Sequence, residues 1–226
     1  MEEKIKLIEK KIKDDLNNLD EEKIESFFDE FKKDKDFSFI EYYNKTVLDK
    51  ERISFGEFVS WRNFAIRGMP RTVYNYFDEN YGKIIEEIKR ERNIEKFFSK
   101  YCKKGNKITN SKRNEVAFCS KLFHTILPDE YPPVDSRVRE RFRECRLPSG
   151  MVGVLIIKKA YKNSIKDKDN KDKLDIIKEV LSKKKFSEFR AGELSDMRIL
   201  DMLYWFGIEK MHIKKVPIGG LSLLAR

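Results

Sequence analysis

The sequence predicts an all-α protein of roughly ten helices. Apolar residues recur at intervals of three and four along most of the chain, as they do on the buried face of a helix. No long stretch alternates apolar and polar residues as a half-buried strand does. The chain has 226 residues, of which 40% are hydrophobic and 12% aromatic. That is enough apolar surface for a packed core.

The N-terminal fifth of the chain is expected to form three helices. Apolar residues repeat at helical spacing through residues 5–16, and the pattern ends near Asn17. Ile24 and three phenylalanines up to residue 31 give a second amphipathic pattern, and residues 39–48 give a third. The first 50 residues therefore predict a small helical unit.

The middle of the chain predicts further helices separated by clear breaks. A fourth helix is expected over residues 55–66, and Gly68-Met69-Pro70 ends it, because glycine tolerates a helix-ending conformation and proline cannot continue a helix. A short helix is expected over residues 74–77 and a long one over 81–101. Residues 103–112 are polar and predict a connection.

The C-terminal half completes the helical pattern. A helix is expected over residues 114–127, whereas the apolar segment 152–161 fits either a helix or a strand. The charged segment 166–173 predicts a solvated loop or the start of a helix, followed by a helix over 174–181. The last helix is expected over 195–206, with the Ser195 side chain as its N-cap.

Charge divides the chain into two parts. Residues 1–50 contain 11 Lys and 15 Asp or Glu, a net charge of −4, while residues 51–226 contain 38 basic and 24 acidic residues, a net charge of +14. We therefore distinguish acidic N-terminal helices, expected to pack on the rest, from a basic helical domain. A basic domain is typical of proteins that bind nucleic acid. We expect DNA as the partner, with RNA as the alternative. A solvated, lysine-rich surface is the alternative explanation.

The remaining composition favours a cytoplasmic protein without cofactor or metal. Its cysteines, Cys102, Cys119 and Cys145, are scattered, odd in number and without metal-type spacing. The two histidines, His124 and His212, form no ligand cluster. No apolar run is long enough to span a bilayer, and the charged N-terminus lacks the apolar core of a signal peptide.

Residues 114–146 contain the strongest functional signal. A helix carrying Lys121 leads through a proline-rich turn to Asp135, and a second, cationic helix follows. Asp135 or Ser136 is expected to be the N-cap of that second helix, a position that also keeps a carboxylate ionised. Arginine is the preferred ligand of phosphate, and the arginines expected to bind nucleic acid are Arg137, Arg139, Arg141 and Arg143. Lys121 itself lies on a flank of its helix, where lysines are usually solvated.

Two segments resemble a known family. SKLFHTILPDEYPPVDSRV (residues 120–138) is similar to the helix–turn–aspartate segment of the helix-hairpin-helix DNA glycosylases, particularly the 8-oxoguanine DNA glycosylase branch. LSDMRILDMLYWFGIEK (residues 194–210) is similar to the C-terminal helix of the compact archaeal-type members, in which an Asp precedes a Trp by one helical turn. Together these segments cover about a fifth of the chain.

The resemblance implies a compact, two-lobed helical fold and a specific chemistry. Such an enzyme flips a damaged base into a pocket between helical lobes, and a lysine attacks the sugar to give a Schiff base. By this resemblance Lys121 is the nucleophile, Asp135 assists it, and Asp201 and Trp205 line the base pocket. Damaged or modified bases are the implied targets, with 8-oxoguanine first.

Two departures from the family pattern leave alternatives open. The glycosylase hairpin carries two closely spaced glycines that bind a phosphate, whereas residues 103–116 contain only Gly105. The basic candidates Lys112 and Arg113 lie later in the same segment. The family lysine also lies about one turn earlier, near Ala117. The sequence therefore predicts either a DNA glycosylase/lyase or a non-catalytic nucleic-acid-binding protein on the same scaffold. The acidic N-terminal fifth is compatible with a third alternative, a helical protein-interaction module that binds no nucleic acid.

Overall fold

The all-α prediction is confirmed. The computed structural model describes residues 1–34, 38–49, 54–61 and 71–208, and within these ranges it contains helices and no strand. The α-helices are α1 (Glu2–Asn17), α2 (Glu21–Lys33), α3 (Ser38–Tyr43), α4 (Phe55–Trp61), α5 (Arg71–Glu91), α6 (Ile94–Phe97), α7 (Val116–Ile126), α8 (Ser136–Arg141), α9 (Met151–Ser164), α10 (Lys168–Leu181) and α11 (Asp196–Phe206). Single π-helical turns, η2 (Asn44–Leu48) and η3 (Phe98–Cys102), extend α3 and α6. The predicted Arg62–Ile66 end of the fourth helix and its Gly68–Pro70 break lie outside the described residues.

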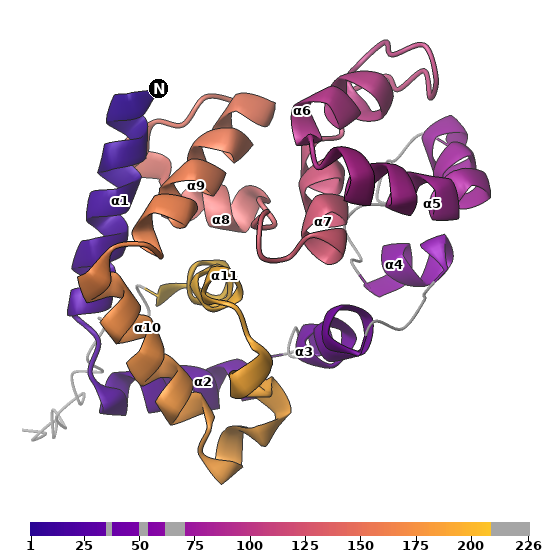
Figure 1. The fold of residues 1–226 in the computed structure, drawn as a ribbon. Helices are drawn as coiled ribbons and strands as arrows, with labels where there is room; N and C mark the ends of the chain where they lie inside the picture. Colours follow the sequence, from indigo (N-terminus) through magenta and orange to yellow (C-terminus); the bar gives the residue numbers. More distant parts are fainter. Residues whose placement is uncertain (35–37, 50–53, 62–70, 209–226) are drawn as a thin grey trace, which may run out of the picture.

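The helices gather in two groups, which Figure 1 shows side by side. Helices α1, α2 and α8 to α11 form one group, and α3 to α7 form the other. The turn over residues 127–135 joins α7 to α8 and crosses from one group to the other (Figure 1). This crossing places the start of α8 next to α7.

The acidic N-terminal helices pack against the basic C-terminal ones. Helix α1 lies along α9 and also contacts α10, while α2 contacts α10. Their apolar faces are buried, with Ile8, Ile12 and Phe28 fully enclosed. On the surface, lysines of the segment after α10 pair with acids of α2, for example Lys185 with Asp29 at 3.1 Å. The compositional boundary at residue 50 therefore does not separate two packing units.

The helix pair expected over residues 74–77 and 81–101 is wrong. A single helix, α5, runs through the whole of 71–91, because Val73, Phe77, Tyr81, Ile84 and Ile88 form one continuous buried stripe. The break comes later, where Arg92 adopts a left-handed conformation with φ of 49°. Asn93 then caps α6 by accepting a hydrogen bond from the Lys96 amide.

The two ambiguous segments are both helical. Residues 152–161 lie within α9, and residues 168–173 form the first turns of α10, whose N-cap is Asp167. Ser195 caps α11 as predicted: its hydroxyl accepts from the Arg198 amide at 3.2 Å. No helix in the described part of the chain is long and apolar enough to cross a membrane.

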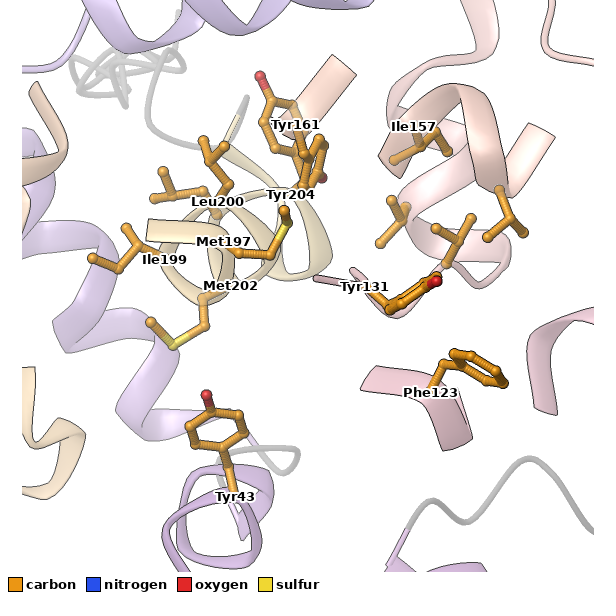
Figure 2. Packing of buried hydrophobic residues seen from close by; sticks show 14 of the residues in the cluster. Tyr43, Phe123, Tyr131, Ile157, Tyr161, Met197, Ile199, Leu200, Met202 and Tyr204 are labelled. Atoms are coloured by element: carbon orange, nitrogen blue, oxygen red, sulfur yellow. The ribbon is translucent and has the colours of Figure 1, made fainter. Parts of the chain in front are cut away.

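Aromatic side chains fill the core where the two groups of helices meet. Tyr161 and Tyr204 lie on one side of this region, and Phe123 and Tyr131 lie on the other (Figure 2). Tyr43 extends from α3 toward α11 (Figure 2). The rings of Phe123 and Tyr131 meet edge to face at 4.9 Å, which is a favourable geometry for aromatic rings. This packing holds the turn between α7 and α8 in place.

Candidate functional site

Lys121 is buried in the middle of α7 and forms an ion pair with Asp135. Its Nζ lies 3.1 Å from Asp135 Oδ2, and the two side chains are 4% and 12% exposed. The expectation that a lysine on this flank is solvated is therefore wrong. The flank is covered because the turn after α7 folds back over it and brings Asp135 alongside.

Asp135 is both the partner of Lys121 and the N-cap of α8. Its Oδ1 accepts hydrogen bonds from the Arg137 amide at 2.9 Å and the Val138 amide at 3.1 Å. Its second oxygen, Oδ2, faces Lys121. The helix N-terminus, with its partial positive charge, and the Lys121 ammonium therefore contact the two oxygens of one carboxylate. The expected cap and the expected Lys–Asp pair therefore both occur: Oδ1 accepts the hydrogen bonds of the cap, and Oδ2 contacts Lys121.

Side chains of α7 hold the turn that delivers Asp135. The Ser120 hydroxyl donates to the Val134 carbonyl at 3.0 Å and accepts from the Val134 amide at 3.2 Å. His124, one turn after Lys121, has its Nδ1 2.8 Å from the Tyr131 carbonyl. These hydrogen bonds attach both halves of the turn to α7, the helix that carries Lys121, and so they fix the position of Asp135.

Tyr161 on α9 belongs to the same neighbourhood. Its side chain is fully buried, and its hydroxyl has no hydrogen-bond partner among the described residues. Burial raises the pKa of this hydroxyl well above its usual value, and the charges of Asp201 and Asp135 raise it further. A neutral, protonated donor therefore lies within electrostatic reach of both carboxylates.

Asp201 and Trp205, expected to line one pocket, have different surroundings. Asp201 is 1% exposed and pairs with Arg198, whose guanidinium stacks over the Tyr43 ring with Cζ 4.5 Å from its centroid. The ring centroids of Trp205 and Phe31 are 6.3 Å apart. The guanidinium of Arg137 lies over the Trp205 ring, with Cζ 4.7 Å from the ring centroid. The sequence signal for Arg198 was its i,i+3 spacing from Asp201, which suits a helical ion pair.

Tyr43 connects Arg198 to α7. Its ring lies 6.0 Å from the His124 ring in a stacked arrangement, while Arg198 stacks over it. Because His124 follows Lys121 by one helical turn, this stack runs from α11 through α3 to the helix of the candidate nucleophile. Nothing in the local sequence indicated Tyr43, because its partners are distant in the chain.

The arginines of α8 and its continuation divide into exposed and fixed ones. Arg137 and Arg143 are exposed, Arg143 pairing with Glu140 at 3.0 Å. Arg139 donates to the Pro148 carbonyl at 2.6 Å, and Arg141 Nε donates to the Tyr204 carbonyl at 3.3 Å. Arg139 and Arg141 are partly buried and anchor α8 to its neighbours, so Arg137 and Arg143 are the more accessible of the four candidates.

The loop between η3 and α7 is basic and held by internal hydrogen bonds, and the N–H of its glycine is one of the donors. Gly105 has φ of 71°, and its N–H donates to the Ser111 carbonyl at 2.8 Å. The buried Asn106 side chain bonds the Tyr101 carbonyl and the Thr109 hydroxyl and braces the loop from inside. The exposed cations of this loop are Lys103, Lys104, Lys107, Lys112 and Arg113. Any contact of this loop with phosphate is thus expected to come from side chains.

Arg113 differs from its neighbour Lys112. Its Nε lies 2.7 Å from Glu115 Oε1, and its Nη2 donates to Glu115 Oε2 at 3.3 Å. This two-point contact raises the pKa of the Arg113 guanidinium through the hydrogen bond to Glu115. Both side chains are exposed, but Arg113 is engaged by Glu115, so Lys112 is the better placed of the two to meet an anion.

Lys158 is a lysine that the sequence did not single out. It lies on α9 with Nζ 3.3 Å from the centroid of the Tyr131 ring, in the turn between α7 and α8. Burial lowers its pKa to about 8, helped by the charge of Lys162 and opposed by the charges of Glu130 and Glu95. This contact ties α9 to the turn that delivers Asp135.

The described residues contain no group of three or more His, Cys, Asp or Glu side chains that could hold a metal ion. Comparison of the chain with protein-family models, curated proteins and solved structures gives no match. Inferences about function therefore rest on the chain's own residues.

Proposed function

We propose that the protein is a DNA glycosylase/lyase that acts on a damaged or modified base, with Lys121 as nucleophile and Asp135 as its partner. The Lys121–Asp135 pair carries this proposal, because a buried lysine held 3.1 Å from a carboxylate is the arrangement that amine chemistry needs. Buried ion pairs seldom stabilise a fold more than apolar residues would. A functional reason for keeping this one is therefore worth testing.

In the proposed reaction, Asp135 takes a proton from the Lys121 ammonium, and the neutral Nζ attacks C1′ of an extruded nucleotide. The C1′–N bond to the base breaks, its electron pair leaves with the base, and the base takes up the proton that Asp135 removed from Lys121. The new C1′–N bond to Lys121 becomes a Schiff base when the sugar ring opens and its ring oxygen takes up a proton lost by the Lys121 nitrogen. Once Asp135 has passed its proton to the departing base, its restored carboxylate stabilises the positive charge on the sugar.

Exposed cations near the pair supply the contacts to the DNA backbone in this proposal. Arg137 and Arg143 lie in the segment that Asp135 begins, and Lys112 lies in the loop that leads into α7. Phosphate contacts of this kind position a duplex without reading its sequence.

We also propose a cytoplasmic location. The three cysteines are buried as free thiols, and free thiols are typical of proteins in a reducing compartment.

One observation favours a second candidate, a non-catalytic nucleic-acid-binding protein. Lys121 is only 3% exposed, so a sugar reaches Nζ only if the surrounding side chains move. In this alternative the ion pair fastens α8 to α7, and the basic surface alone provides the function. Binding that weakens steeply with salt is expected of both candidates, but a covalent intermediate is expected of the enzyme alone.

Borohydride trapping distinguishes the two candidates. Duplexes carrying an abasic site or 8-oxoguanine are incubated with wild-type protein, Lys121→Gln and Lys158→Gln. The enzyme proposal expects a covalent adduct on the abasic duplex that disappears in Lys121→Gln and persists in Lys158→Gln, the control at a half-buried lysine. No adduct with folded wild-type protein, together with salt-sensitive binding, would favour the non-catalytic candidate.

A further inference from the structure

The Arg198 guanidinium has an unused hydrogen-bonding edge inside the protein. Its Nη1 donates to Asp201 Oδ2, whereas its buried Nε has no hydrogen-bond partner in the described part of the chain. The residue is only 6% exposed. Buried polar groups are nearly always satisfied, so a buried donor without an acceptor calls for an explanation.

The geometry of the guanidinium defines what would satisfy this edge. Nε–H and the adjacent N–H of Nη2 point the same way in one plane, so they match two neighbouring acceptors of a planar partner. Nη1 is turned toward Asp201, and the Tyr43 ring covers one face of the guanidinium, which together fix its orientation. Arg198 thus presents two parallel donors in a fixed orientation, the N–H groups of Nε and Nη2, which we call the fork.

The surroundings favour a neutral partner over an anion. Asp201 already balances the charge of Arg198, and Asp135 balances that of Lys121. The Tyr161 hydroxyl, also buried and without a hydrogen-bond partner among the described residues, feels the charges of Asp201 and Asp135. A phosphate or carboxylate at the fork would lie beside Asp201 with no excess positive charge to offset it. The neutral edge of a base meets no such penalty.

We propose that Arg198 is the specificity-determining residue of the site and reads two adjacent acceptors, O6 and N7, on an extruded purine. This inference rests on the proposed function and narrows its substrate class. Arginine binds the O6/N7 edge of guanine with two hydrogen bonds, and hypoxanthine presents the same edge. Adenine places an N6 donor there, and 8-oxoguanine carries a hydrogen on N7, so neither matches the fork. A modified purine that keeps O6 and an unprotonated N7 therefore replaces 8-oxoguanine as the expected target.

A binding measurement tests this inference without needing catalysis. Fluorescence anisotropy compares oligonucleotide duplexes that carry one unpaired hypoxanthine with the same duplexes carrying 7-deazahypoxanthine, in which C–H replaces N7. Wild-type protein is expected to bind the N7-containing duplex about tenfold more tightly, as for a two-point arginine contact. Arg198→Lys keeps the positive charge but lacks the fork, so the preference is expected to disappear. Arg90→Gln, an exposed arginine on α5, is the control and keeps it.

The outcomes separate this inference from the proposed function. Equal binding of both duplexes by the wild-type protein would overturn the role of Arg198, and so would tighter binding of 8-oxoguanine than of hypoxanthine. The wild-type comparison decides the matter even if Arg198→Lys does not fold. Trapping on a preformed abasic site needs no base at all. It therefore reports on Lys121 and not on Arg198, so failure of the role of Arg198 can be told from failure of the proposed function.

Discussion

Lys121 Nζ on α7 lies 3.1 Å from Asp135 Oδ2 at the N-terminus of α8, and both side chains are largely buried. Removing one member leaves a buried charge without its partner. We expect Lys121→Met to lower the free energy of unfolding by about 3 kcal/mol.

A double-mutant cycle isolates this interaction. Asp135→Asn removes the charge but keeps the cap, because asparagine and aspartate are equivalent N-caps. Lys121→Met combined with Asp135→Asn should therefore cost less than the sum of the single changes, with a coupling energy of about 1 to 3 kcal/mol in chemical denaturation. Additive effects would mean that the two residues do not interact in solution.

Two buried tyrosines give opposite predictions for loss of a hydroxyl. Tyr161 Oη has no hydrogen-bond partner among the described residues, whereas Tyr204 Oη donates to Asp15 Oδ2 at 2.8 Å. Tyr204→Phe removes a buried hydrogen bond to a carboxylate, which keeps the Lys11 ammonium 3.1 Å from the same oxygen, and should cost about 1 to 3 kcal/mol. Tyr161→Phe removes an unsatisfied group and should be neutral or stabilising. Thermal and urea unfolding of the pair measure this, and equal losses would contradict the hydrogen-bond assignment.

Gly153 is required by close packing at the start of α9. An added Cβ would lie 2.5 Å from the Pro148 carbonyl oxygen and would also meet the Arg139 guanidinium. The carbonyl belongs to the backbone and cannot swing away, so Gly153→Ala should lower the free energy of unfolding by about 1 to 3 kcal/mol.

Gly56 on α4 is the matched control for this change. Its nearest neighbour to an added Cβ would be Tyr74 Oη at 3.8 Å, an ordinary contact. Gly56→Ala should gain up to about 1 kcal/mol from the better helix propensity of alanine. Equal effects of the two substitutions on the midpoint of urea unfolding would refute the close packing inferred at Gly153.

The two kinds of arginine around α8 predict different responses to salt. Exposed Arg143 is a candidate phosphate contact, so Arg143→Gln should weaken DNA binding and reduce the slope of log K against log salt by about 1. Arg139→Gln should instead lower stability by about 1 kcal/mol, because its bond to the Pro148 carbonyl is lost, and leave the slope nearly unchanged. Anisotropy titrations at several salt concentrations compare them. An unchanged slope in Arg143→Gln would remove that residue from the interface.

Much of the fold could be predicted from local patterns, because each helix carries its own apolar stripe and its own cap. The Ser195 cap and the turn that delivers Asp135 are local features of this kind. Burial of Lys121 could not be predicted, because it depends on the turn folding back over α7. The pairing of Tyr43 with His124 and Arg198 joins three separate helices, and no spacing in the sequence encodes it. The i,i+3 spacing of Arg198 and Asp201 predicts an ion pair, but its burial comes from tertiary packing.

The central claim is that Lys121 forms the covalent bond to the sugar. Its most direct test is to trap the wild-type protein on an abasic-site duplex with borohydride, digest the adduct and locate the modified lysine by mass spectrometry. We predict that the sugar remnant is found on the peptide that contains Lys121, and that Asp135→Asn lowers the yield of the same adduct. Attachment at any other lysine, or no adduct with folded protein, would contradict the claim.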